Sequence, residues 1–361
     1  MNWAVYKRFA QFVTIGRQRE TSSPKVVTNI YIQKKNPHNM QKPKVFVTRK
    51  IPDKGLTLLK KHCDVKIHKH DKVISKKELL AGVKWCDALL CLLTDKIDKS
   101  IINANPNLKI ISNYAVGYNN IDIKHAQSKK IPVGNTPGVL TDAVAEHTFA
   151  LMLAITKRIT ESDQFTKKGK YKGWAPMLLL GTELKGKTLG VVGLGRIGAE
   201  VAEKAVKGME MNVLYHNIHK KPKFEKKYHA KKVSLPTLLK KSDVISIHVP
   251  LIPSTHHLIG KKELALMKKT AYLVNTSRGP VVDEKALVVA LKKRQIRGAA
   301  LDVYEHEPKL SKGLNKLKNV VLTPHTASAT IEARQAMSEI AAKNILGVLF
   351  KKFKSPSLVK V

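Results

Sequence analysis

Short apolar runs recur along most of the chain, and stretches that mix apolar and charged residues separate them. From residue 45 onward this rhythm predicts strands at residues 45–47, 65–67, 88–93, 108–112 and 131–133, with a helix over 53–62. Strands that alternate with helices form a parallel sheet covered by helices. The first part of the chain is therefore predicted to be an α/β domain.

A long apolar helix separates this series from a second one. Residues 143–159 are apolar on more than one side, which indicates burial on several faces. Residues 163–185, which include Trp174, are predicted to form a loop. Further strands are expected at residues 189–192, 212–215, 244–248, 271–275, 298–303 and 320–322, and a last helix over 331–350 is expected to return to the first domain.

The first strand of the second series leads into a glycine-rich turn. Gly193, Gly195 and Gly198 follow the apolar run with the spacing of the dinucleotide fingerprint, and a helical pattern comes next. The three glycines permit a tight turn, close approach of a pyrophosphate and close packing of helix on strand. With Arg196 and Ile197 at the start of the helix, these residues are predicted to bind NAD or NADP.

These patterns together predict two Rossmann-like α/β domains with parallel sheets and a cleft between them. The first is expected to be flavodoxin-like and to comprise residues 41–142 and 327–361, and the dinucleotide-binding domain is expected to comprise residues 143–326. Residues 1–40 hold seven basic residues and one acidic residue. They are interpreted as a disordered extension, a targeting presequence, or a stretch upstream of a start at Met40. The expected location is cytoplasmic, or organellar if they are a presequence.

Charge and cysteine content limit the kinds of ligand and macromolecule that the chain is expected to bind. Lysine and arginine number 66 against 27 acidic residues, a net charge of +39. The lysines are spread along the chain, largely as pairs, without the interleaved aromatics of a nucleic-acid-binding face, so a surface suited to anionic ligands is predicted and specific nucleic-acid binding is not. No apolar run has the length of a membrane span. Cys63, Cys86 and Cys91 are interpreted as small buried side chains, and no metal site is expected.

Polar residues follow three predicted strands of the second domain at one sheet edge. Arg278 offers a fork-shaped cation for a substrate carboxylate, and His325 can donate a proton to an alkoxide. Glu307 can hold that histidine protonated. This triad beside a dinucleotide turn predicts hydride reduction of a 2-oxo acid.

The chain after residue 40 resembles the D-isomer-specific 2-hydroxyacid dehydrogenases, and within them the glyoxylate/hydroxypyruvate reductases. The resemblance rests on residues 88–95, 116–122 and 135–142, the glycine turn, and the sequences Ser-Arg-Gly at 277–279 and Thr-Pro-His at 323–325. It implies a homodimer built through the coenzyme domain, a small 2-oxo or 2-hydroxy acid as substrate and NAD(P) as cofactor. It further implies Arg278, Glu307 and His325 as the catalytic residues, Val116 and Gly117 as substrate-binding residues, and Thr141, Thr276 and Asp302 as cofactor-binding residues.

Two alternatives are considered at this point, and the second stays open. Formate dehydrogenases of the same superfamily carry glutamine at the position of Glu307, which argues against them. Corepressors of the C-terminal-binding-protein type share the fold and the triad, so a non-enzymatic dinucleotide sensor, or a protein associated with nucleic acid, is the second hypothesis.

The preferred cofactor is predicted from the strand near residue 215. An NAD-specific site usually carries a carboxylate where this strand ends, to hold the ribose hydroxyls. Here residues 215–221 contain none, whereas Asn217, Lys220 and Lys221 offer a hydrogen-bond donor and two cations. NADPH is therefore expected to be favoured over NADH, with Asn217 in the cofactor site.

Overall fold

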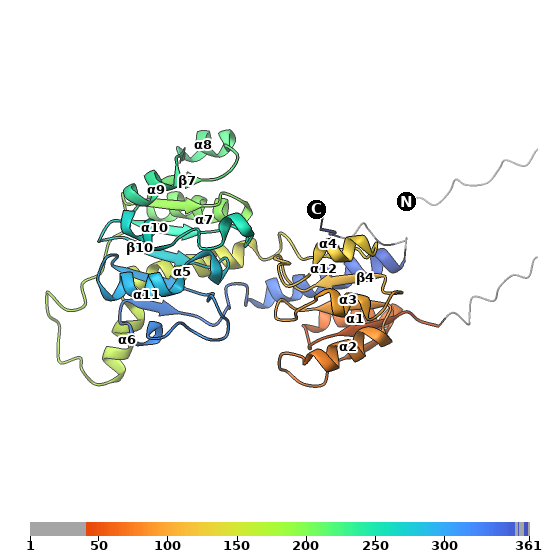
Figure 1. The fold of residues 1–361 in the computed structure, drawn as a ribbon. Helices are drawn as coiled ribbons and strands as arrows, with labels where there is room; N and C mark the ends of the chain where they lie inside the picture. The colour runs from red at the N-terminus through yellow and green to blue at the C-terminus, as the bar shows by residue number, and fades with distance from the viewer. Residues whose placement is uncertain (1–40, 351–352, 354–356, 360–361) are drawn as a thin grey trace, which may run out of the picture. The chain divides into compact units, whose positions relative to one another are not determined.

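The computed structural model describes residues 41–350, 353 and 357–359 and contains two parallel β-sheets (Figure 1). The predicted extension, residues 1–40, lies outside the described residues. No helix in the described ranges is long and apolar enough to cross a membrane.

The first sheet has five strands in the order β2-β1-β3-β4-β5, which is the flavodoxin-like order. Its strands are β1 (Lys44–Val47), β2 (Asp64–Ile67), β3 (Ala88–Cys91), β4 (Ile110–Asn113) and β5 (Val133–Gly134). Its helices are α1 (Asp53–His62), α2 (Lys76–Trp85), α3 (Lys99–Asn103), α4 (Ile123–Ser128) and α12 (Ile331–Leu349).

The second sheet has seven strands in the order β12-β11-β10-β9-β6-β7-β8. Its strands are β6 (Thr188–Val192), β7 (Asn212–His216), β8 (Lys231–Lys232), β9 (Val244–Ile247), β10 (Tyr272–Asn275), β11 (Gly298–Leu301) and β12 (Val320–Leu322). The strand order reverses between β6 and β9, and ligands of open α/β sheets bind at this switch point beyond the carboxyl ends of the strands.

The helices of the second sheet are α5 (Thr141–Thr156), α6 (Ile159–Lys167), α7 (Arg196–Met209), α8 (Pro222–Tyr228), α9 (Leu235–Lys241), α10 (Lys261–Leu266) and α11 (Glu284–Lys292). Short 3₁₀ turns occur at Pro253–Thr255, Gly279–Val281 and Leu314–Lys316. The sheet therefore carries helices on both faces, as the alternating pattern predicts.

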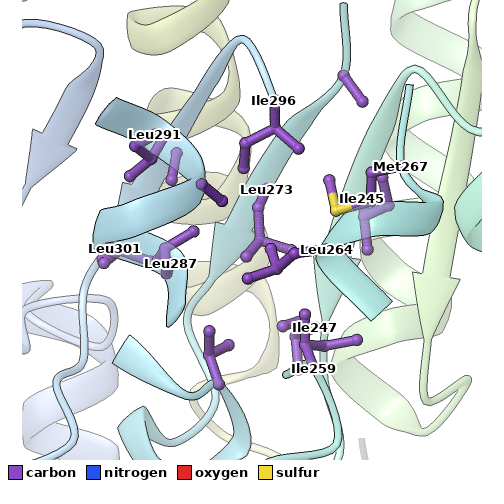
Figure 2. Close-up of a cluster of buried hydrophobic side chains, with 14 of the residues drawn as sticks. Ile245, Ile247, Ile259, Leu264, Met267, Leu273, Leu287, Leu291, Ile296 and Leu301 are labelled. Carbon is purple, nitrogen blue, oxygen red and sulfur yellow. The ribbon is translucent and has the colours of Figure 1, made fainter. Parts of the chain in front are cut away.

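Each sheet is buried on both faces because alternate strand residues point to opposite sides. In the first sheet, Val45 and Val47 pack with α1 and α12, whereas Phe46 packs with α2. In the second, Leu273 packs against α10 and α11 in the cluster of Figure 2, and the neighbouring Val274 packs against α5 and α7. The sheets are thus rigid supports for the loops that leave their carboxyl ends.

The last helix returns to the first sheet, as predicted. Ser112 of β4 donates a hydrogen bond to the carbonyl of Ala341 (2.9 Å), and the backbone N–H of Gly55 in α1 donates to Ser338 Oγ (3.1 Å). The chain therefore passes from the first sheet to the second before α5 and back before α12.

The prediction of one helix over 143–159 was wrong. Arg158 adopts a left-handed backbone conformation (φ 55°), so α5 ends at Thr156 and α6 starts at Ile159. The carbonyl of Thr156 accepts the N–H of Thr182 (2.8 Å), which fixes the returning chain against this helix end. The predicted loop 163–185 accordingly begins with the end of α6.

The sequence analysis also missed β8, a two-residue edge strand made of lysines. Several predicted strands are one or two residues too long, and for some of them the extra residues belong to the site loops. The strand predicted at 298–303, for example, ends at Leu301. Cys63, Cys86 and Cys91 are buried and unbridged, in agreement with their interpretation.

Candidate active site

The glycine turn has the geometry that a dinucleotide phosphate requires. Gly193 has φ 98°, and a Cβ there would lie 2.8 Å from the carbonyl oxygen of His248. A Cβ on Gly198 would collide with the carbonyl of Gly193, so α7 can approach the strand only with glycine at that position. A Cβ on Gly195 would meet no atom within 4 Å, which leaves open space where the helix begins. The first turn of α7, with Arg196 and Ile197, offers free N–H groups to an anion there.

The end of β7 lies beside this turn. Asn217 Oδ1 accepts the N–H of Leu194 (3.2 Å), and its Nδ2 donates to the carbonyl of His219 (2.9 Å). Lys220 pairs with Glu225 of α8 (3.4 Å). The segment 215–221 lacks a carboxylate in sequence, yet the fold brings Glu225 to it. This partner was not expected from the sequence, because α8 was not predicted.

His325 and Glu307 form the pair expected from the sequence. Their Nδ1 and Oε2 atoms are 2.9 Å apart, and Glu307 Oε1 accepts the N–H of Tyr304 (3.0 Å). Burial acts to raise the pKa of Glu307, but the bond and charge of His325 outweigh it and leave that pKa below its usual value. An ionised Glu307 thus faces the ring and leaves its other nitrogen, Nε2, free to exchange a proton.

Arg278 follows β10 of the second sheet and contacts the loop that follows β4 of the first sheet. Its Nε donates to Asn119 Oδ1 (3.1 Å) and its Nη1 to the carbonyl of Ser277 (2.7 Å). A Cβ on Gly117 would collide with the guanidinium, so only glycine allows this approach. Burial lowers the pKa of Arg278 and the charge of Glu307 opposes that shift, but an arginine remains cationic at neutral pH.

The backbone at Val116 and Gly117 is arranged to offer donors. The carbonyl of Val116 accepts from Asn135 Nδ2 (2.9 Å), and that of Gly117 accepts from Asn113 Nδ2 (2.8 Å). The N–H groups of both residues find no acceptor within the described ranges. Two free donors beside the Arg278 guanidinium make a site suited to a carboxylate.

Asp302 is fully buried and supports the loop that carries His325. Its carboxylate accepts the N–H groups of Thr326 and Ala327 (both 2.8 Å) and the hydroxyl of Thr323 (2.6 Å). Its backbone carbonyl accepts the N–H of His325 (2.9 Å). Burial acts to raise the pKa of Asp302, but these bonds and His147 bring it below the ordinary value. The predicted contact of Asp302 with the nicotinamide stays a prediction.

Helix α5 contacts the residues that follow β10 and β11. Thr141 is its first residue, Thr148 Oγ1 lies 2.9 Å from Thr276 Oγ1, and His147 Nε2 lies 3.4 Å from Asp302 Oδ1. His147 was not predicted, although a histidine directly before Thr148 on a largely apolar helix was a signal. Thr276 is buried, with its hydroxyl directed to α5.

Glu284 is a second residue that sequence reasoning missed. It begins α11, is only 3% exposed, and accepts the N–H groups of Glu305 (2.8 Å) and Ser311 (2.6 Å). Glu305 in turn accepts the N–H of Glu284 (3.1 Å) and pairs with His257 (2.8 Å). These bonds tie down both ends of the loop that carries Glu307. Acidic residues are common in the first turn of a helix, so the sequence held no clear signal.

Comparisons with known proteins agree with this geometry. The model of the family "D-isomer specific 2-hydroxyacid dehydrogenase, NAD binding domain" matches residues 149–327. The glyoxylate reductase of Thermofilum pendens is 54% identical over 86% of this chain and 92% of its own. The structure of the TT0316 protein from Thermus thermophilus is 40% identical, with a TM-score of 0.82 over 88% of this chain and 100% of that one. An NADPH-dependent glyoxylate/hydroxypyruvate reductase from Sinorhizobium meliloti, solved with NADP and malonate, is 28% identical, with a TM-score of 0.77 over 88% and 97%.

Proposed function

This chain belongs to the D-isomer-specific 2-hydroxyacid dehydrogenases and is an NAD(P)-dependent oxidoreductase, and we propose on that basis that it reduces glyoxylate to glycolate, or hydroxypyruvate to its D-2-hydroxy acid. The observation that carries the proposal is the His325–Glu307 pair, together with Arg278, beyond the carboxyl ends of the strands that carry the glycine turn. Its glyoxylate reductase relatives support a small 2-oxo acid as substrate.

Each residue of the site has one task in this proposal. Arg278 and the N–H groups of Val116 and Gly117 hold the substrate carboxylate, which orients the 2-oxo carbon. His325 donates the proton that the developing alkoxide needs, and Glu307 orients the ring through its contact with Nδ1. NAD(P)H, held by residues 193–198, supplies the hydride when bound. The segment from residue 143 to residue 326 thus holds the cofactor and carries Arg278, Glu307 and His325, and the rest of the described chain supplies the Val116 and Gly117 donors.

A non-enzymatic dinucleotide sensor on the same fold is not favoured. The relatives from Thermofilum pendens and Sinorhizobium meliloti are reductases, and nothing in the described site is missing for chemistry: an acid, a carboxylate that supports it and an anion clamp are all present. The high charge is accordingly assigned to anionic substrates and cofactors rather than to nucleic acid.

We propose NADPH as the preferred cofactor. The support is the absence of a carboxylate between Tyr215 and Lys221, where it would repel a 2′-phosphate, together with Lys220 and Lys221. The S. meliloti reductase was solved with NADP. The ion pair of Lys220 with Glu225 moderates the preference, because part of the lysine charge is already neutralised.

We also propose that the protein is a homodimer, and that the loop after α6 takes part in the interface. Trp174 and Met177 are 82% and 77% exposed, and Leu180 is 49% exposed, so one loop presents three large apolar side chains to solvent. Exposed apolar clusters of this kind mark interfaces. Light scattering that gives the mass of a single chain would contradict this proposal.

The test of the activity is a steady-state panel. Glyoxylate, hydroxypyruvate, pyruvate and a bulkier 2-oxo acid are each assayed with NADH and with NADPH. We expect the highest kcat/KM for glyoxylate or hydroxypyruvate with NADPH. No turnover of any 2-oxo acid with either cofactor would overturn the proposed function, whereas a larger kcat/KM with NADH would overturn only the cofactor preference.

A further inference from the structure

A basic cavity lies at the amino-terminal end of the second sheet. The proposed reaction takes place at the opposite, carboxyl-terminal end of the strands. The cavity has a volume of about 390 Å³ and is lined in part by Arg158, Arg294, Arg297 and Lys318. Tyr272 and Val320, the first residues of β10 and β12, also line it. The proposed catalytic residues follow the other ends of these strands, so three or four residues of strand, at about 3.3 Å each, separate the two sites.

The choice of cation in this cavity is unusual for the chain. Lysines far outnumber arginines in the sequence, and residues 41–350 contain only seven arginines, yet three of them line this one cavity. A guanidinium presents a planar fork that binds phosphate or carboxylate through two hydrogen bonds, whereas an ammonium acts as a point charge. A solvated basic surface would not need this substitution of arginine for lysine.

The backbone at two of these arginines is also unusual. Arg158 (φ 55°) and Arg294 (φ 53°) both adopt the left-handed conformation, Arg158 between α5 and α6 and Arg294 just after α11. At such helix ends glycine or asparagine is the usual residue. Strained positions held by larger side chains are often functional. Here both strained residues are arginines that line the same cavity.

The charges of the cavity are only partly satisfied within the chain. Arg158 binds Glu161 through two hydrogen bonds (2.8 and 2.9 Å). In the described residues the side chains of Arg294, Arg297 and Lys318 form no ion pair or hydrogen bond. The Arg158–Glu161 pair shows the fork geometry that a carboxylate takes here, and the other three cations remain available.

We propose that this cavity binds a small polyanion with two or more phosphate or carboxylate groups. The cavity volume lies in the range of small-ligand sites, about 300–1,000 Å³, and the available charges suit a ligand with at least two negative groups. The site is separate from the cofactor turn and from Arg278, so its ligand is neither the substrate nor the nicotinamide cofactor.

The test uses inorganic pyrophosphate and citrate as probes. Binding is measured by calorimetry on the full chain with saturating NADPH, at an ionic strength of about 0.15 M to suppress nonspecific attraction. We expect one saturable site per chain. The double variant Arg294→Gln/Arg297→Gln is expected to weaken binding at least tenfold, because each arginine loses a charge-assisted contact.

The matched control is Lys240→Gln/Lys241→Gln. These residues line a second basic cavity whose cationic side chains, apart from His229, are all lysines, so the control removes the same charge from a comparable place. It should leave the affinity within about twofold, since screened charges at a distance contribute little. Binding is also expected to persist in Arg278→Gln, which lacks the proposed substrate clamp.

Four results would overturn the proposal. One is no saturable binding of either probe, and another is equal weakening by the arginine and lysine variants. The third is loss of binding in Arg278→Gln, which would assign the anion to the active site. If the arginine variant changes the oligomeric mass and not the affinity, the cations serve a contact between subunits and the proposal is also wrong.

Discussion

His325 is held by more bonds than a surface histidine. Its backbone is left-handed (φ 55°), a conformation that costs about 1–3 kcal/mol for such a residue. Its N–H binds the Asp302 carbonyl, its ring binds Glu307, and the following two N–H groups bind the Asp302 carboxylate. Because the pKa of Asp302 is lowered, this anchoring is complete above the unfolded value of about 3.9 and is lost as pH falls through the folded value.

The Glu307→Gln variant tests the pair directly. Glutamine keeps an oxygen that can accept from Nδ1 but removes the negative charge beside the ring, so kcat/KM is expected to fall and its dependence on pH to change. The measurement is kcat/KM against pH, with Glu332→Gln, an exposed residue of α12, as the control. A profile identical to that of the unmodified protein would show that Glu307 does not act on His325.

At the scale of elements, two loops carry the His325–Glu307 pair, and each is held in place by a buried carboxylate. Asp302 fastens the loop with His325, and Glu284 fastens the loop with Glu307. Both carboxylates can affect catalysis without contacting a ligand. They hold the two loops in place, and the proton donor and its partner must stay within hydrogen-bond distance.

The Glu284→Gln variant tests whether the hydrogen bonds of Glu284 to the loop of Glu307 support catalysis. Glutamine keeps one acceptor but turns an NH₂ group toward a backbone N–H, which leaves a buried donor unsatisfied at about 1–3 kcal/mol. We expect kcat to fall about tenfold, the pH profile to change and the NADPH dissociation constant to stay the same. Unchanged kcat and pH profile with a lower melting temperature would mean that Glu284 serves stability alone.

The helices and strands were largely predictable from the sequence. The hydrogen bonds by which buried side chains hold the site loops in place were not. Runs such as 189–192 are apolar because both faces of a parallel sheet are buried, so the strands, their order of succession and the glycine turn could be recognised. Glu284 and His147 act across more than ten residues of chain, and local patterns carry no trace of such contacts. The break at Arg158 was missed for the same reason, since the chain near Thr182 fixes it.

Cofactor preference is a property of the end of β7. Asn217→Asp keeps the acceptor for the Leu194 N–H and adds a negative charge beside the proposed 2′-phosphate position. We expect kcat/KM for NADPH to fall by about tenfold or more, with a much smaller change for NADH. An equal loss with both cofactors would place Asn217 away from the ribose.

At the scale of the whole molecule, charge is the dominant feature. With a formal charge of +39, the protein attracts anionic substrates and cofactors from solution. We expect kcat/KM for glyoxylate to decrease as ionic strength rises from about 0.01 to about 0.15 M, while kcat changes little. A kcat/KM that is independent of salt would mean that the field does not contribute to substrate capture.

The central claim is that His325 protonates a 2-oxo acid reduced by NADPH. The most direct measurement is a single turnover, in which the NADPH complex is mixed with excess glyoxylate and both NADPH oxidation and glycolate are followed. The account predicts stoichiometric glycolate from the unmodified protein and a rate about 10²–10⁴-fold lower for His325→Ala, with unchanged NADPH binding and no effect of His306→Ala. Glycolate formation at the unmodified rate by His325→Ala would contradict it.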